Sequence, residues 1–359
     1  MRVIITAGGT GGHIYPALAI ADKVMQIEPD SEILYIGTHN RMEKDIVPNH
    51  GYRYESIEIY GFSKTMLKRN LLNIKLISNA KKKCIKLMQE FKPDVVVGVG
   101  GYVTFPVIKA AKKLGVPTFI HEQNSIPGKS NRWLSRSVSK IGVTFEDTMK
   151  YLDKDKCVLT GHPCSESAID IKAIPKTKFG LDRKKKSVLI VQGSLGSSTM
   201  NQKMQEFLSS IDNEKYDVLY VTGKSTYEEF SKNKFSKNVK VVPYVDNMPA
   251  LMKDIDLMVT RCGAGSICEA MALQLPCIYI PSPFVANNHQ YHNAISLKTA
   301  KAGEMLEEKD LTSDKLKEVI NKILDDERYY KEIQNNLKKL SINNSSTIIY
   351  NILKELTNK

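Results

Sequence analysis

The architecture of this chain is set at its start by the stretch Ile4-Ile5-Thr6-Ala7-Gly8-Gly9-Thr10-Gly11-Gly12-His13. A short apolar run stops at a loop with almost no side chains, and apolar residues with helical spacing follow at once. This pattern predicts a buried strand, a glycine-rich turn and an amphipathic helix. Bare amides at a helix N-terminus can bind a phosphate, although a tight strand-to-helix turn would need glycine as well.

The same arrangement of an apolar run and a glycine loop occurs three more times. Gly98-Val99-Gly100-Gly101-Tyr102 follows residues 95–97, Gly193-Ser194-Leu195-Gly196 follows residues 187–191, and Gly263-Ala264-Gly265-Ser266 follows residues 257–260. Ligands of doubly wound sheets bind beyond the carboxyl ends of the strands. Four loops at such places therefore predict sites for two phosphate-bearing molecules.

Strands alternate with helices along the whole chain. Continuous apolar strands such as Val95-Val96-Val97 are typical of parallel sheets that are covered on both faces. We predict an α/β protein with two doubly wound, Rossmann-like parallel-sheet domains facing a cleft, braced by C-terminal helices. The predicted strands are residues 3–7, 33–36, 54–59, 95–99, 118–121 and 140–143, then 187–191, 217–221, 239–243, 257–260 and 277–280. The predicted helices are residues 15–26, 71–91, 107–114, 200–211, 266–272, 287–300 and 312–326, with only helix after that, through residue 356.

The boundary between the two halves falls in residues 161–186, which hold two prolines and a run of charged residues. We place the N-terminal domain at residues 1–163 and the C-terminal domain at residues 164–359. The last helix of the C-terminal domain could cross back to the first domain.

Composition describes an ordinary globular chain: 359 residues, 42% hydrophobic and 25% charged. No apolar stretch approaches the roughly 20 residues of a membrane-spanning helix, and the run at residues 3–5 is too short for a secretory signal. The six cysteines include no CxxC pair, so they predict reduced thiols rather than a zinc or redox site.

The net charge of +13 favours an anionic partner. Residues 61–91 hold eight basic residues and one acid, interleaved with apolar ones. This composition suits contact with an anionic membrane surface, although an ordinary helix with its lysines in water would explain most of residues 74–91. No nucleic-acid-binding motif accompanies the charge, so we expect no nucleic acid.

Two familiar cofactor motifs are incomplete. Gly9-Thr10-Gly11-Gly12-His13-Ile14 lacks the last glycine of the dinucleotide fingerprint, and no acid ends the second predicted strand. Two segments match the metal-binding DxD pattern, but neither lies where a site is expected. Asp153-Lys154-Asp155 lies in a charged loop, and Asp254-Ile255-Asp256 opens a strand at the end away from the expected site. We therefore expect neither NAD nor a metal held by these acids.

Polar clusters follow three of the predicted strands. His121-Glu122-Gln123-Asn124 comes directly after one strand, and Asn287-Asn288-His289-Gln290 follows another. In Arg261-Cys262-Gly263-Ala264-Gly265-Ser266-Ile267-Cys268-Glu269, the glycines and Ser266 open a helix that can hold a diphosphate. Glu269, one turn in, can accept hydrogen bonds from ribose hydroxyls; alternatively, it is an ordinary acid of the first turns that the helix dipole stabilises.

These residues resemble the MurG family. The matching motifs are GGTGGH at residues 8–13, GGY at 100–102, HEQN at 121–124, the loop at 193–196, the segment at 261–269, and HQ..NA at 289–294. They occur in order over nearly the whole chain. The resemblance implies a GT-B fold and inverting transfer of N-acetylglucosamine (GlcNAc) from UDP-GlcNAc to the 4-hydroxyl of undecaprenyl-linked lipid I, giving lipid II in peptidoglycan synthesis.

The resemblance also implies a peripheral enzyme at the cytoplasmic face of the cell membrane, with no cofactor, and with cell-wall and division proteins as partners. It assigns the donor UDP-GlcNAc mainly to the C-terminal domain: Ser194 and Asn201, Val245 against uracil, Gly263, Ala264, Gly265, Ser266 and Ile267 on the diphosphate, Glu269 on the ribose, and His289 and Gln290 on the sugar. Thr10, Gly11, Gly12, His13 and Asn124 would close the site, and the acceptor diphosphate would lie on Gly8–Gly12, Gly100, Gly101 and Tyr102.

The chain departs from the family pattern at three places. Ser165 replaces an arginine that contacts the donor, Gln192 replaces the first glycine of the third loop, and residues 100–106 read GGYVTFP in place of GGYxSGP. These departures bear on donor affinity and acceptor fit rather than on the reaction class.

A general base must take the proton of the attacking hydroxyl, and the candidates are His13 and Glu122. His13 could instead only bind phosphate. Other functions remain open at this stage: a related transferase that glycosylates diacylglycerol, a sugar-nucleotide epimerase, or a binding protein without activity.

Overall fold

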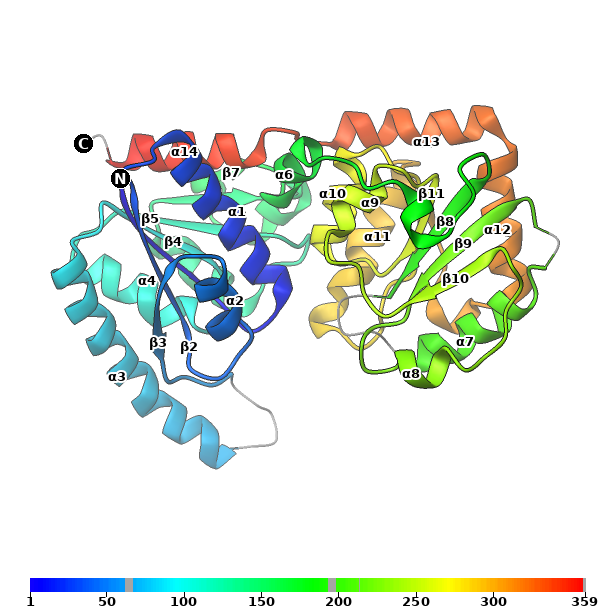
Figure 1. Ribbon diagram of the computed structural model, residues 1–359. Coiled ribbons are helices and arrows are strands. Elements are labelled where there is room, and N and C mark those ends of the chain that lie inside the picture. The colour runs from blue at the N-terminus through cyan, green and yellow to red at the C-terminus, as the bar shows by residue number, and fades with distance from the viewer. Residues whose placement is uncertain (62–66, 193–197, 213, 358–359) are drawn as a thin grey trace. The chain divides into compact units, whose positions relative to one another are not determined.

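The computed structural model describes residues 1–61, 67–192, 198–212 and 214–357 (Figure 1). By its contacts the chain divides into two compact units. Unit 1 comprises Met1–Cys164 and Asn344–Lys359, and unit 2 comprises Ser165–Asn343. Each unit has a parallel sheet of its own.

Unit 1 contains a seven-stranded parallel sheet in the order β3-β2-β1-β4-β5-β6-β7. Val3 of β1 pairs with Ile33 of β2 on one side and with Val95 of β4 on the other. The order of the chain reverses between β1 and β4, so the loops after these two strands leave the sheet at its switch point. The strands are β1 (Arg2–Ala7), β2 (Glu32–Thr38), β3 (Arg53–Ile57), β4 (Val95–Gly100), β5 (Thr118–Glu122), β6 (Lys140–Val143) and β7 (Cys157–Leu159).

Helices cover both faces of this sheet, because alternate residues of each strand point to opposite sides. Val3 and Ile5 face the cluster formed with α1 and α14, whereas Ile4 faces the cluster formed with α3 and α4. Figure 1 shows that α14, near the C-terminus, lies beside α1, near the N-terminus. The helices are α1 (Gly11–Ile27), α2 (Glu43–Asn49), α3 (Leu67–Phe91), α4 (Thr104–Lys113), α5 (Lys129–Leu134) and α14 (Ser345–Thr357).

Unit 2 contains a six-stranded parallel sheet in the order β10-β9-β8-β11-β12-β13. Its strands are β8 (Lys186–Val191), β9 (Tyr216–Val221), β10 (Val239–Val242), β11 (Leu257–Thr260), β12 (Cys277–Tyr279) and β13 (Glu304–Met305). Its helices are α7 (Ser198–Ser209), α8 (Tyr227–Phe230), α9 (Met248–Met252), α10 (Ala264–Ala272), α11 (His289–Thr299), α12 (Ser313–Asp325) and α13 (Glu327–Leu340), and α6 (Cys164–Asp170) begins at the last residue of unit 1's first segment.

The predicted fold class, two doubly wound parallel-sheet domains, is confirmed. Every predicted strand is present, with ends within a few residues of the predicted ones. β7 and β13 were not predicted, because these edge strands are too short to show a pattern. The short helices α2, α5, α6, α8 and α9 were not predicted either, because each has too few turns for a periodic apolar face.

Candidate functional site

Two of the glycine loops meet at the carboxyl edge of the unit 1 sheet. The Gly8 amide, after β1, donates to the carbonyl of Gly100, at the end of β4 (3.3 Å). A Cβ on Gly101 would lie 2.4 Å from the Gly8 carbonyl oxygen. Gly100 and Gly101 also have φ angles of +118° and +84°, which residues with a side chain rarely adopt. The two loops therefore pack backbone against backbone, and this packing requires glycine.

A buried carboxylate that the sequence analysis missed lies against the first loop. Glu43, at the start of α2, has no exposed surface, and its Oε2 accepts from the Gly9 amide at 3.1 Å. Its Oε1 accepts from the amide (3.1 Å) and the hydroxyl (2.5 Å) of Thr38, the last residue of β2. An acid five residues beyond a strand end matches no motif, so no local signal could have identified it.

The outward part of the first loop is the N-terminus of α1. Thr10 is its N-cap residue, with extended backbone and an exposed side chain. Gly11 is half-buried and Gly12 exposed in the first turn, where amides have no partner within the helix. The Gly8 and Gly9 amides serve contacts inside the protein, so Gly11 and Gly12 are the glycines placed to bind an anion.

His13 lies over the second glycine loop. A Cβ on Gly100 would be 2.5 Å from His13 Cδ2, so this ring rests directly on the Gly100 backbone. His13 Nδ1 is 3.2 Å from the Gly8 carbonyl oxygen. A carbonyl can only accept, so Nδ1 carries the proton and the lone pair of the neutral ring is on Nε2.

Glu122, the other candidate base, is buried and engaged by four donors. Its Oε1 accepts from the amide (3.1 Å) and side-chain nitrogen (3.4 Å) of Asn124, and its Oε2 from the Gly128 amide (3.0 Å) and Asn131 Nδ2 (2.9 Å). These bonds hold the loop that joins β5 to α5. Each oxygen of this carboxylate is thus already occupied by two donors of the protein.

His121 and Gln123 of the same cluster point into the core. Burial lowers the pKa of His121 to about 4, and its Nε2 donates to the Gly161 carbonyl at 2.9 Å. Gln123 Nε2 donates to His121 Nδ1 at 3.1 Å. Hydrogen bonds at both nitrogens therefore fix the neutral imidazole of His121, and this residue has a structural role. Tyr102 is only half-buried, against Gly61.

In unit 2, the loop after β11 leads into α10, with Gly263 as N-cap and Ala264, Gly265, Ser266 and Ile267 in the first turn. A buried ion pair between Arg261 Nη1 and Glu308 Oε2 (2.7 Å) holds the start of this loop. Asn293 Nδ2 of α11 donates to the Cys262 carbonyl at 3.1 Å. The N-terminus of α10 is therefore a fixed set of amides with the positive end of a helix dipole, which suits a diphosphate.

Glu269 lies one turn into α10 and keeps part of its side chain accessible. Burial raises the pKa of its carboxyl to about 7. Ser165, which by the resemblance would stand in place of an arginine, is buried, and its hydroxyl donates to the Cys268 carbonyl at 3.2 Å. A neutral hydroxyl therefore lies on the backbone of α10, at the residue before Glu269.

The remaining predicted donor residues lie around the same sheet edge. Asn201 of α7 is buried, and its Oδ1 accepts from the Tyr220 hydroxyl. Val245, after β10, is buried. His289 begins α11, and Gln290 Oε1 accepts from the Ser282 amide at 2.9 Å. Ser194 lies outside the described residues.

The predicted membrane segment divides into two parts along α3. Ala80, Cys84 and Met88 are buried in the unit 1 core, as an ordinary amphipathic helix would have them. Leu72 and Ile74 are instead 52% and 59% exposed. Residues 62–66 lie outside the described residues.

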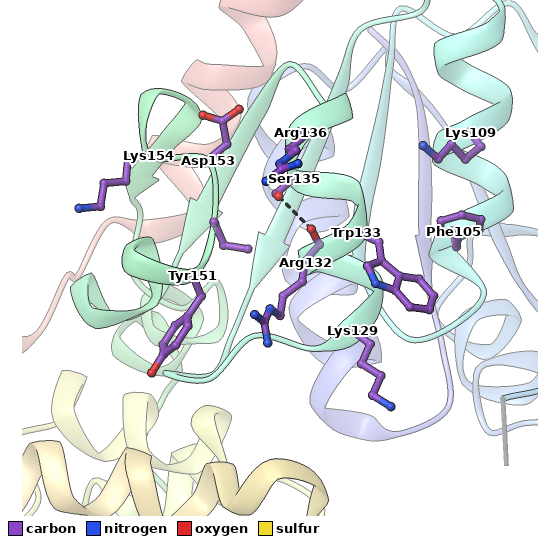
Figure 2. A pocket seen from close by; sticks show the side chains of 11 residues that line it. Phe105, Lys109, Lys129, Arg132, Trp133, Ser135, Arg136, Tyr151, Asp153 and Lys154 are labelled. Carbon is purple, nitrogen blue, oxygen red and sulfur yellow. Dashed lines mark hydrogen bonds between the residues drawn. The ribbon is translucent and has the colours of Figure 1, made fainter. Parts of the chain in front are cut away.

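A second basic surface lies beside α4, which packs on α3. A pocket of about 1280 Å³ is lined by Lys109, Lys129, Arg132 and Arg136 together with Trp133. Figure 2 shows these side chains around the pocket, with Phe105 next to Trp133. Trp133 is 63% exposed. A large exposed aromatic side chain is unusual on a protein surface that binds nothing.

Within residues 1–61, 67–192, 198–212 and 214–357, no three His, Cys, Asp or Glu side chains form a group that could hold a metal ion. In the same ranges, no helix is both long and apolar enough to cross a membrane.

Comparisons with known proteins agree over the whole chain. Residues 3–143 match the glycosyltransferase family 28 N-terminal domain, and residues 187–348 match the family's C-terminal domain. The chain is 41% identical to the UDP-N-acetylglucosamine–N-acetylmuramyl-(pentapeptide) pyrophosphoryl-undecaprenol N-acetylglucosamine transferase of Bacillus pumilus, over 99% of this chain and 100% of that one. It is 40% identical to the protein of the same name from Bacillus subtilis, over 99% of each.

Among solved structures, Acinetobacter baumannii MurG superposes with a TM-score of 0.80 at 25% identity, over 99% of both chains. The UDP-GlcNAc 2-epimerase of Neisseria meningitidis, solved with UDP-GlcNAc, has a TM-score of 0.70 at 16% identity, over 99% of this chain and 100% of that one. This second likeness shows a common fold alone.

Proposed function

This chain belongs to glycosyltransferase family 28 and, within it, to the UDP-N-acetylglucosamine–N-acetylmuramyl-(pentapeptide) pyrophosphoryl-undecaprenol N-acetylglucosamine transferases, and from that premise we propose how its residues share the reaction. The enzyme transfers GlcNAc from UDP-GlcNAc to the undecaprenyl-linked N-acetylmuramyl-pentapeptide, lipid I, and so makes lipid II for peptidoglycan. The observation on which the residue assignment rests most is the N-terminus of α10 with Glu269 one turn inside it.

Unit 2 would bind the donor. The first-turn amides of α10, from Gly263 to Ile267, take the diphosphate, and the Glu269 carboxylate accepts from the ribose hydroxyls. His289 and Gln290, at the start of α11, would contact the GlcNAc hydroxyls, and Asn201 and Ser194 would complete the site. Val245 is buried, so uracil would lie against the outer surface of that segment.

Unit 1 would bind the acceptor. The diphosphate of lipid I lies at the N-terminus of α1, on the amides of Gly11 and Gly12 and beside the Thr10 hydroxyl. Gly8 and Gly9 shape the loop rather than donate to the ligand, since their amides already serve Gly100 and Glu43. Gly100, Gly101 and Tyr102, in the second glycine loop, would lie beside the same diphosphate.

In the reaction, the 4-hydroxyl oxygen of the acceptor sugar attacks C1 of GlcNAc, and the bond from C1 to the β-phosphate oxygen breaks with inversion. The bonding electron pair leaves with UDP, whose developing charge the N-terminus of α10 stabilises. His13 Nε2 takes the proton of the attacking hydroxyl. Glu122 holds the β5–α5 loop and, with it, Asn124.

The enzyme would work as a peripheral protein at the cytoplasmic face of the membrane that carries its lipid acceptor. Exposed Leu72 and Ile74 on α3 and exposed Trp133 supply apolar contacts. The lysines of α3 and the basic residues of the pocket in Figure 2 supply attraction to anionic headgroups.

Turnover of UDP-GlcNAc with a soluble lipid I analogue tests this assignment. We expect UDP release and a disaccharide product, and loss of the product in the His13→Ala variant at saturating substrates. Near-full turnover by that variant would remove His13 from the role of base. Release of UDP with diacylglycerol as the acceptor, but not with the lipid I analogue, would contradict the assigned acceptor.

A further inference from the structure

Glu43 and His13 are joined through a single peptide unit. The N–H of the Gly8–Gly9 peptide donates to Glu43 Oε2 at 3.1 Å. The carbonyl of the same peptide, on Gly8, accepts from His13 Nδ1 at 3.2 Å. A buried carboxylate therefore holds one end of a peptide dipole, and the imidazole is bonded to the other end.

We propose that Glu43 is a positioning residue for His13, acting through the Gly8–Gly9 peptide. This inference rests on the proposed role of His13 as the general base. A carboxylate bonded to the N–H polarises the peptide, which makes its carbonyl oxygen a stronger acceptor for the imidazole Nδ1–H. The peptide thus holds the tautomer in which Nε2 takes the proton, and it stabilises the imidazolium that forms.

The Gly9 end of the peptide depends on Glu43, because Gly9 offers little rigidity of its own, whereas the Gly8 end packs against Gly100 and Gly101. Gly9 has a φ of +97°, and no neighbouring atom lies within 4 Å of where its Cβ would be. Glu43 is itself fixed, since Thr38 donates to its Oε1 twice and a Cβ on Gly37 would meet its Cγ at 2.8 Å. The Glu43 carboxylate therefore anchors the conformationally free backbone of Gly9 to the end of β2.

Two phenols and a second carboxylate lie around Glu43. Tyr35 of β2 and Tyr54 of β3 face it, and burial, followed by the charge of Glu43, raises the pKa of both phenols, which therefore stay neutral. Asp45, on α2 itself, adds negative charge on the Tyr54 side. On the other side of the loop, Tyr15 lies against Gly11, and Tyr102 follows the second glycine loop, so neither places a positive charge beside the peptide.

A glutamine at position 43 would have nearly the same shape but no charge. Its side chain could accept from either Gly9 or Thr38, but its amide nitrogen would then face the other donor. Thr38→Val is the matched control, because it removes one bond to Oε1 while leaving the charge and the bond from Gly9 in place.

The first test follows the ring directly, without substrate, by ¹⁵N NMR of labelled histidines, with His13→Ala to assign the signals. In Glu43→Gln we expect the midpoint of the His13 titration to fall by about 1 pH unit, and in Thr38→Val by less than about a third of that. An unchanged midpoint in Glu43→Gln, or an equal fall in both variants, would overturn the inference.

A second measurement needs no variant at position 43, in case Glu43→Gln does not fold. In the wild-type protein, the amide signal of Gly9 should titrate with the same midpoint as the His13 ring, because both belong to one hydrogen-bonded chain. A Gly9 amide signal that ignores the His13 titration would refute the coupling.

The pH profile of kcat separates this inference from the proposed function. We expect the acidic limb to move by about 1 pH unit in Glu43→Gln, with a smaller change in the KM for UDP-GlcNAc. If His13→Ala abolishes turnover but Glu43→Gln leaves the limb in place, the inference fails and the proposed base stands. If His13→Ala keeps near-full turnover, the proposed base fails, whatever NMR shows for the ring.

Discussion

The proposed contact between Glu269 and the donor ribose predicts a donor affinity that depends on pH near neutrality. Burial raises the pKa of this carboxyl to about 7, against an ordinary value of 4.5. In the proposed complex, ribose hydroxyls would donate to the charged form, so binding of UDP-GlcNAc would favour the carboxylate and release a proton. Affinity should therefore be highest above pH 7 and should fall as the pH drops through that value.

The size of the effect follows from the fraction of Glu269 that is ionised. With a pKa of about 7, that fraction falls roughly ninefold to tenfold between about pH 8 and about pH 6, which corresponds to about 1.4 kcal/mol of binding free energy.

Calorimetric titration of UDP-GlcNAc into the enzyme over this range measures both the dissociation constant and, with buffers of different ionisation heat, the proton release. UDP-GlcNAc suits the assay because both of its phosphates are diesters that do not titrate there. We expect weaker binding and a flat profile for Glu269→Gln. A 2′-deoxy donor should bind the wild type more weakly, with little further loss in the variant.

Two results would refute the reasoning. One is an affinity that does not change between about pH 8 and about pH 6, since a carboxyl with a pKa near 7 that binds the ribose must couple to the proton. The other is a Glu269→Gln variant that keeps the wild-type slope.

Three further predictions concern unit 1. Gly100→Ala should abolish turnover, because its Cβ would lie 2.5 Å from the His13 ring at a φ of +118°; a variant that folds and keeps wild-type kcat contradicts this. Hydrogen bonds, first from Lys354, lower the pKa of Glu28 to about 2 from 4.5, so Glu28→Gln should cost about 1 kcal/mol of unfolding free energy above pH 5 and clearly less near pH 2, where the folded-state carboxyl begins to protonate; an equal loss at both pH values in chemical denaturation would exclude the carboxylate. Ile74→Glu should weaken sedimentation with anionic vesicles severalfold while leaving turnover of a soluble acceptor analogue unchanged, and binding equal to that of the wild type would remove α3 from the membrane surface.

Local patterns in the sequence were sufficient for the fold class. The apolar strand Val95–Val97 and the helical spacing after His13 each depend on residues close together in the chain, and the structure confirms both elements. The glycine loops were also visible, because a strand end without side chains is a local property. Ends of elements moved by a few residues, since caps and first turns carry no apolar pattern.

The site was predicted less completely than the fold. Motifs identified His13, Glu122 and Glu269 as polar residues after strands, but they did not show that Glu122 accepts four hydrogen bonds. Burial and bonding of a side chain depend on neighbours from other elements. The elevated pKa of Glu269 has the same origin, because packing around α10 removes water from its carboxyl.

The order of the strands in the sheet separates what the sequence alone determined from what only the tertiary structure decided. Periodicity and glycine placement act over a few residues, so the sequence alone determined the alternating strands and helices and the loop that ends at His13. Glu43 reaches the Gly9 amide only because β2 pairs with β1, and Gly100 supports the His13 ring only because β4 pairs with β1 on the other side. Contacts between residues 30 to 90 positions apart depend on which strands become neighbours in the sheet, and local sequence patterns do not predict the order of the strands.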